Sequence, residues 1–136
     1  MSIFTAPAIE SWEVANNDLD RRFVAAMSHK DIEGAMSCFV NSPDLVAVLW
    51  GKEFRGPQQL REAIESVFRQ YDEVALAIDR VREFRSGDSV LAVGQATYTF
   101  KKAGEVSRLT EIWTDVRREV NGHWVYVMDH AEVLPN

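Results

Sequence analysis

Cysteine is almost absent from this sequence of 136 residues, and the single one, Cys38, excludes a disulfide within the chain. It lies in a mostly apolar run with helical spacing, so we expect it to pack in the core rather than act as a nucleophile. The sequence contains no CxxC, HExxH, GxGxxG or P-loop pattern, and its three histidines lack metal-ligand spacing. These absences predict a protein with no bound metal and no cofactor.

Long apolar runs and an excess of basic charge are missing as well. No apolar stretch approaches the ~20 residues of a membrane-spanning helix, and the first ten residues, MSIFTAPAIE, lack the basic start and apolar centre of a secretion signal. The 15 Lys and Arg residues are outnumbered by 21 Asp and Glu, which gives a net charge of −6, whereas nucleic-acid binding calls for a basic surface. We therefore expect a cytoplasmic protein that binds neither a membrane nor nucleic acid.

The hydrophobic pattern changes from helical to strand-like periodicity near residue 74. Before that point the spacing predicts three helices, at 11–30, 31–40 and 57–71. Between the second and third helices it predicts a strand at 45–50 and a turn-rich bridge at 51–56. After it, alternating β-branched and aromatic residues predict four antiparallel strands, at 74–84, at 89–101 and in a long hairpin over 108–134.

This order of elements predicts an α+β fold, with three N-terminal helices packed on a strongly curved, mostly antiparallel sheet. No linker or repeat interrupts the chain, so we expect one domain over 1–136 with its core at about 10–134. Helices covering a bent sheet leave a cone whose open end is a natural small-molecule pocket.

The final hairpin turns at Asn121-Gly122 and holds four ionisable residues in an apolar setting, Glu111, Asp129, His130 and Glu132. Buried ionisable groups are costly unless they are paired or used, so we expect the chemistry of the protein here. The register of the hairpin decides whether Asp129 or His130 faces the pocket.

Two registers are possible for this hairpin. A two-residue turn would place Glu111 opposite Glu132, whereas a three-residue loop with a glycine bulge would place Glu111 opposite Ala131 and Trp113 opposite Asp129. Like charges directly opposite one another destabilise a strand pair, so we favour the bulged register. It puts Glu111, Trp113 and Asp129 on one face.

Three segments, in this order, resemble one known family: DIEGAMSCF at 31–39, FRGPQQLREAI at 54–64, and TEIW at 110–113 followed by NGHWVYVMDH at 121–130. They resemble the nuclear-transport-factor-2-like (NTF2-like, cystatin-like) superfamily, specifically its SnoaL-like branch, which is similar to ketosteroid isomerases and polyketide cyclases. The resemblance covers roughly residues 10–134 and implies the NTF2-like cone.

The ending also resembles the association domain of calmodulin-dependent kinase II, in which pocket arginines sit on the final hairpin. Their positions fall here on Glu111 and Ala131, and both lie on the Asp129 face in the favoured register. Because neither is an arginine, the resemblance does not imply a carboxylate ligand at these positions. Met128 stands where relatives often carry a histidine.

Asp129 is our candidate general base, because burial among apolar neighbours would raise its pKa into a useful range. Glu111 is the candidate acid partner on the same face, and His130 is a third catalytic candidate. The competing interpretations are a solvated or arginine-paired Asp129, and a Glu111 paired with Arg108 or Arg82.

The expected ligand-binding residues are aromatic: Trp50, Phe54 and Trp113 as apolar walls, and Tyr98 as a hydroxyl in the pocket. We expect either a cofactor-independent isomerase, cyclase or hydrolase that acts on a small, largely apolar substrate, or a non-catalytic ligand-binding or dimerisation module. We also expect a homodimer formed through an outer sheet face that carries Trp124, Tyr126 and Met128.

Overall fold

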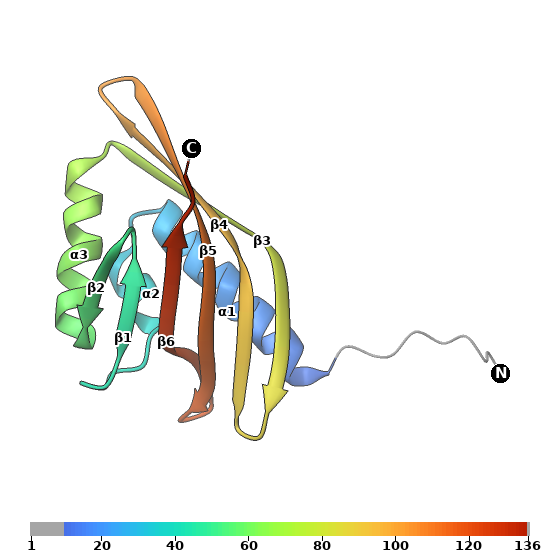
Figure 1. Cartoon of the computed structure of the whole chain (residues 1–136). Helices are drawn as coiled ribbons and strands as arrows, with labels where there is room; N and C mark the ends of the chain where they lie inside the picture. The colour runs from blue at the N-terminus through green and yellow to red at the C-terminus, as the bar shows by residue number, and fades with distance from the viewer. Residues whose placement is uncertain (1–9, 136) are drawn as a thin grey trace, which may run out of the picture.

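Three helices and six strands make up the part of the chain that the computed structural model describes, residues 10–135 (Figure 1). The helices are α1 (Ser11–Ser28), α2 (Ile32–Ser37) and α3 (Gly56–Gln70). The strands are β1 (Val46–Leu49), β2 (Lys52–Arg55), β3 (Glu73–Ser86), β4 (Ser89–Lys102), β5 (Glu105–Val120) and β6 (His123–Val133).

The helix ends follow from local sequence in two of the three helices. The Asp31 side chain accepts a hydrogen bond from the Gly34 N–H (2.9 Å) and caps α2, and Pro57 lies in the first turn of α3. At α1 the cap position is held by Glu10, which makes no side-chain cap bond, and Ser11 is the first helical residue.

The bridge predicted at residues 51–56 contains a strand, β2, which pairs with β1 through a two-residue turn at Trp50-Gly51. Both turn residues have a left-handed backbone, with φ of 55° at Trp50 and 79° at Gly51. Such a turn fits the twist of a hairpin but normally carries Asn, Asp or Gly at its first position. A bulky aromatic residue there gives no hairpin signal, so the sequence pattern missed the strand.

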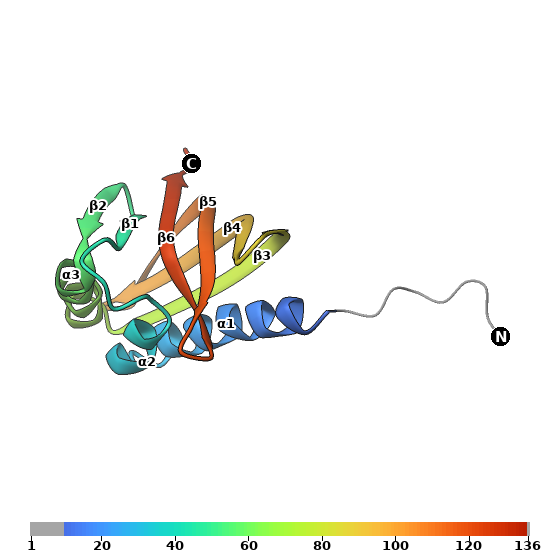
Figure 2. The same cartoon turned by 90° about the horizontal axis from the view of Figure 1, so that it is seen from below.

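The six strands form one sheet in the order β2-β1-β6-β5-β4-β3. All neighbours are antiparallel except β1 and β6, which run parallel, so the last strand lies between the short N-terminal hairpin and the long C-terminal strands. Figures 1 and 2 show a strongly curved sheet with α1, α2 and α3 on its concave side. This arrangement confirms the predicted mostly antiparallel, curved sheet packed against three helices.

The register of the last hairpin differs from both alternatives. The turn has two residues, with Val120 opposite His123, and the bulge lies farther along β6, where Val127 is the extra residue. Beyond it Glu111 pairs with Val133, so the three-residue loop that we favoured is wrong.

The same register places Asp115 directly opposite Asp129, the kind of like-charge pair that our argument sought to avoid. The argument failed because it assumed that both carboxyl groups are ionised, whereas both residues are buried and burial favours the protonated form.

The bulge also overturns the expected outer face. Tyr126 is buried on the concave side, with its ring centroid 5.8 Å from that of Phe23 and 5.2 Å from that of Phe39. Met128 pairs with Val116 beyond the bulge, so Tyr126 and Met128 do not share one phase. No helix within residues 10–135 is long and apolar enough to cross a membrane.

Candidate active site

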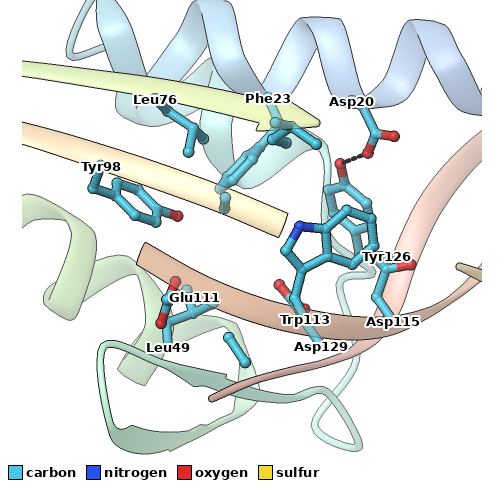
Figure 3. Close-up of a pocket in the computed structure, with 13 residues that line it drawn as sticks. Asp20, Phe23, Leu49, Leu76, Tyr98, Glu111, Trp113, Asp115, Tyr126 and Asp129 are labelled. Atoms are coloured by element: carbon cyan, nitrogen blue, oxygen red, sulfur yellow. Dashed lines mark hydrogen bonds between the residues drawn. The ribbon is translucent and has the colours of Figure 1, made fainter. Parts of the chain in front are cut away.

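A small cavity lies on the concave side of the sheet, between α1 and strands β3 to β6 (Figure 3). Its volume is about 30 Å³, comparable to that of one water molecule. Most of its walls are apolar, but four carboxyl-bearing side chains line it: Asp20, Glu111, Asp115 and Asp129. This accumulation of acids in the core is the most unusual feature of the molecule.

Arg117 on β5 neutralises part of this charge, and its side chain is fully buried. Its Nε donates to Asp115 Oδ1 (2.8 Å), its Nη2 to Asp20 Oδ1 (2.8 Å), and its Nη1 to the Asn16 carbonyl (3.2 Å). The Tyr126 hydroxyl donates to the same Asp20 oxygen (2.6 Å). One guanidinium thus serves two aspartates and ties α1 to the last two strands.

Asp129 is left outside this network. It is 9% exposed, and among residues 10–135 its buried Oδ1 has no hydrogen-bond partner. Burial raises the pKa of Asp129 well above its usual value, the charges of Asp115 and Glu111 raise it further, and Arg117 opposes the rise. A buried carboxyl group under these influences keeps its proton.

Glu111 has a different environment on the same face. It is 1% exposed, and its Oε2 accepts a hydrogen bond from the backbone N–H of Trp50 (2.8 Å). Burial raises the pKa of Glu111, and this bond from Trp50 opposes the rise. The ionised form of Glu111 therefore has a hydrogen-bond donor that is not provided to Asp129.

Asp115 shows how strongly the interior disfavours charge. Although Arg117 contacts it at two atoms, burial raises the pKa of Asp115 to about 6. The phenol of Tyr98 responds in the same direction: burial and then the charges of Glu111 and Asp129 raise its pKa well above 10. The cavity therefore favours neutral groups.

The indole of Trp113 fills the middle of the site (Figure 3). It lies against the backbone of β4 at Gly94, where an added Cβ would come within 2.4 Å of Trp113 Cζ2. Among the described residues the buried Trp113 Nε1 has no acceptor. Glycine at position 94 is thus what lets a large aromatic side chain lie beside the acids.

Of the residues predicted from the sequence, the structure brings Asp129, Glu111, Tyr98 and Trp113 to the interior cavity. Trp50 and Phe54 instead line a separate cleft of about 310 Å³ beside α3. His130 is exposed, because it pairs with Thr114 on the opposite face of the sheet from Asp129.

The proposed ion pairs of Glu111 with Arg108 or Arg82 are not formed, and both arginines are exposed. Asp129 is neither solvated nor directly paired with an arginine. Among residues 10–135 no group of three or more His, Cys, Asp or Glu side chains is placed to hold a metal ion.

Sequence reasoning missed Arg117, Asp115 and Asp20. A signal was present in part, because Asn16 and Asp20 share the spacing of the apolar residues of α1, and Asp115 and Arg117 alternate in phase with Trp113. Polar residues in a buried phase indicate a buried network, but the pattern does not say which partners meet.

Comparison with known proteins now adds to this geometry. The model of the SnoaL-like domain matches residues 21–127, and no curated protein sequence matches the chain. Solved structures that share the fold do so at low sequence identity.

A putative calcium/calmodulin-dependent protein kinase II association domain from Xanthomonas campestris is 18% identical, with a TM-score of 0.77 over 97% of this chain and 94% of that one. A putative dehydratase of the NTF2-like family from Streptomyces avermitilis is 16% identical, with a TM-score of 0.80 over 90% and 96%. A type 2 hexachlorocyclohexane dehydrochlorinase is 15% identical, with a TM-score of 0.78 over 92% and 86%.

Proposed function

This chain belongs to the SnoaL-like family, and from that premise we propose that it is a cofactor-independent enzyme that applies general acid–base chemistry to a small, largely apolar substrate. The observation that carries the proposal is Asp129, a buried carboxyl group with an unpartnered oxygen at a cavity. Such a group lowers stability unless it is used, so its retention favours a functional role.

The two carboxyl groups have distinct roles in this proposal. Asp129 holds its proton and is the general acid, whereas Glu111, whose ionised form accepts the Trp50 N–H, is the general base. These roles are opposite to those expected from the sequence. The reversal rests on the environments of the two groups. Burial and nearby carboxylates raise the pKa of Asp129, whereas at Glu111 the Trp50 N–H opposes the rise caused by burial.

The reaction class that fits this pair is proton transfer at a carbon next to a carbonyl group, the first step of isomerase- and cyclase-type chemistry. Glu111 takes the proton, the C–H electron pair becomes the enol double bond, and Asp129 gives its proton to the carbonyl oxygen. The charge of the site does not change during the step. A hydrolase-type reaction uses the same pair, with water in place of the carbon acid.

Two of the solved structures with this fold support enzyme chemistry of this kind, because they are named as a putative dehydratase and a dehydrochlorinase. Both names describe eliminations, in which a base removes a proton and a leaving group departs. At 15% and 16% identity they support the fold directly and the chemistry only by analogy.

The test is exchange of solvent deuterium into the carbon next to the carbonyl of cyclic and aryl ketones, followed by NMR. We expect Glu111→Gln and Asp129→Asn each to lose about 10²–10⁴-fold in exchange rate, and Glu132→Gln, an exposed acid on β6, to keep the parent rate. Exchange at the parent rate in both interior variants would overturn the proposal.

We also propose that the chain forms a homodimer through the convex face of the sheet. One row of apolar residues crosses four strands there, because Phe84 pairs with Leu91, Leu91 with Val116, and Val116 with Met128. Phe84 and Leu91 are 54% and 40% exposed, Ile112 nearby is 51% exposed, and Figure 2 shows the helices on the other side. A contiguous apolar patch of this kind is typical of an interface.

A second copy is the occupant that fits this surface, because a flat patch on one sheet face can pair with itself across a twofold axis. The Xanthomonas protein of the same fold is named as a putative association domain, which supports assembly as a use of this fold. We expect sedimentation at micromolar concentration to give the dimer mass for the parent and the monomer mass for Leu91→Glu. Val106→Glu, at an exposed apolar residue outside the row, is the control. A monomeric parent would refute the dimer. It would also remove the alternative of a non-catalytic association module, because such a module requires assembly.

A further inference from the structure

The interior cavity cannot hold a whole substrate. Its volume of about 30 Å³ suits a water molecule or one functional group, whereas ligand pockets usually measure about 300–1,000 Å³. The body of the substrate therefore needs a second place to bind.

A cleft of about 310 Å³ lies beside α3 and has the size that the interior lacks. Aromatic rings form much of its wall: Trp50, Phe54, Tyr71 and Phe100. We call it the aromatic cleft. Large flat rings contribute apolar area and stacking surface, so this lining suits a planar aromatic or cyclic compound.

Two rings separate the aromatic cleft from the acids. The centroids of Trp50 and Tyr98 are 5.6 Å apart in an edge-to-face contact, and Tyr98 stacks in turn on Phe100 at 5.8 Å. Tyr98 lines the interior cavity, whereas Trp50 and Phe100 line the cleft. The backbone N–H of Trp50 also donates to Glu111, so this residue contacts both compartments.

The backbone of Trp50 adds a second, independent observation. A φ of 55° is unfavourable for a bulky side chain, and strained residues tend to cluster at functional sites, where surrounding contacts hold them. Here the bond to Glu111 and the contact with Tyr98 hold the ring at the boundary between the cleft and the cavity.

The two compartments differ in charge. The interior carries four carboxyl groups and one arginine, so it repels an anion, whereas Lys52 is the one charged residue among the described residues that line the cleft. A substrate with a negative group can therefore enter only if that group stays at Lys52.

We propose that the aromatic cleft binds the ring system of an aromatic or cyclic carboxylate, with the carboxylate at Lys52 and the uncharged end directed at Trp50 and Tyr98. This location differs from the hairpin positions Glu111 and Ala131. The binding site stands on the cleft itself, and only the orientation of the bound compound rests on the proposed acid–base function.

The experiment compares two probes of the same shape, 2-naphthoate and the neutral 2-naphthamide, by calorimetric titration of the full chain. We expect the parent to bind both and to prefer the carboxylate. Lys52→Met should weaken binding of 2-naphthoate about 1.5- to fivefold, the range for an exposed ion pair, and leave binding of 2-naphthamide unchanged. Lys102→Met, at an exposed lysine outside the cleft, is the matched control.

A second variant tests the place of binding. Ser66→Trp puts a bulky ring into the cleft from α3 and should remove binding of both probes, with circular dichroism confirming the parent fold. In NMR spectra of the parent, the indole N–H signal of Trp50 should shift when 2-naphthoate is added. Failure of either probe to bind the parent at millimolar concentration overturns the proposal, and so does equal binding of 2-naphthoate by parent and Lys52→Met.

These readouts are separate from catalysis, because Asp129 does not line the cleft and Asp129→Asn should bind both probes as the parent does. Binding that depends on Lys52, without deuterium exchange on any ketone, would retain the cleft and remove the acid–base function. Deuterium exchange could depend on Asp129 while Lys52→Met leaves the KM for a keto acid unchanged. That outcome would retain the acid–base function and reject the cleft as the substrate-binding site.

Discussion

Replacing Asp129 with asparagine should make the protein more stable at neutral pH while it removes activity. The buried Oδ1 of Asp129 has no partner among residues 10–135, and three further carboxyl groups line the same cavity. Asparagine keeps the shape of the side chain and cannot ionise. The gain comes from the ionisation that asparagine cannot undergo, because each pKa unit by which the folded state raises the pKa of Asp129 is worth about 1.4 kcal/mol in the free energy of unfolding.

The gain should depend on pH in a defined direction. The pKa of Asp129 is raised from 3.8 in the folded protein, so the stability that its proton contributes is fully present below pH 3.8. That stability is lost as the pH rises towards the folded-state pKa, at up to about 1.4 kcal/mol per pH unit. The variant has no proton to lose here, so its advantage over the parent should grow from pH 5 to pH 8.

Urea denaturation at pH 5, 6, 7 and 8 measures this advantage, and Glu132→Gln on the same strand controls for the loss of an acid at an exposed site. We expect the free-energy difference between Asp129→Asn and the parent to rise by at least about 1 kcal/mol across this range. The control should follow the parent curve. A difference that stays constant with pH would mean that Asp129 titrates normally, and the reasoning about the interior acids would be refuted.

Three further outcomes test other parts of the structure. Arg117→Met should lower the free energy of unfolding by about 3–5 kcal/mol, because it leaves two buried aspartates without a cation, whereas Arg118→Met, at an exposed site, should stay within about 0.5 kcal/mol; a loss under 1 kcal/mol at Arg117 would contradict the network. Gly94→Ala should cost about 1–3 kcal/mol through the clash with Trp113, and the same substitution made in a Trp113→Leu background should cost much less in the same urea assay. The Cys38 thiol is buried, and burial raises its pKa to about 11. A thiol reagent at pH 7.5 should therefore label it only after urea is added. Rapid labelling of the folded protein would show that this region opens.

Much of the fold could be predicted because the relevant signals are local. The helices and the long strands follow from residue periodicity, and the turns at Asn121-Gly122 and Ala103-Gly104 fall where turn residues occur. The Trp50-Gly51 turn carries no such signal at its first residue, and the β2 strand it begins was therefore missed.

The candidate site was harder to predict, because it depends on phase and on distant contacts. The bulge at Val127 reverses which residues of β6 face inward, and nothing in a run of β-branched and aromatic residues marks where an extra residue will sit. Asp20 and Arg117 lie 97 positions apart in the chain. Their pairing follows from the packing of α1 against the sheet, which residue spacing alone cannot give.

The position of β6 in the middle of the sheet has a consequence for how the chain is made. β1 and β2 are joined to β5, β4 and β3 only through β6, which follows the other five strands in the sequence. Until residues 123–133 emerge, the sheet exists as two separate pieces. Asp20 on α1 also lacks the hydrogen bond that the Tyr126 hydroxyl donates to it in the folded protein. Elements made first therefore cannot complete their contacts until β6 has been made. We expect the nascent protein to remain sensitive to protease until residues 123–133 have left the ribosome, and then to gain resistance in one step.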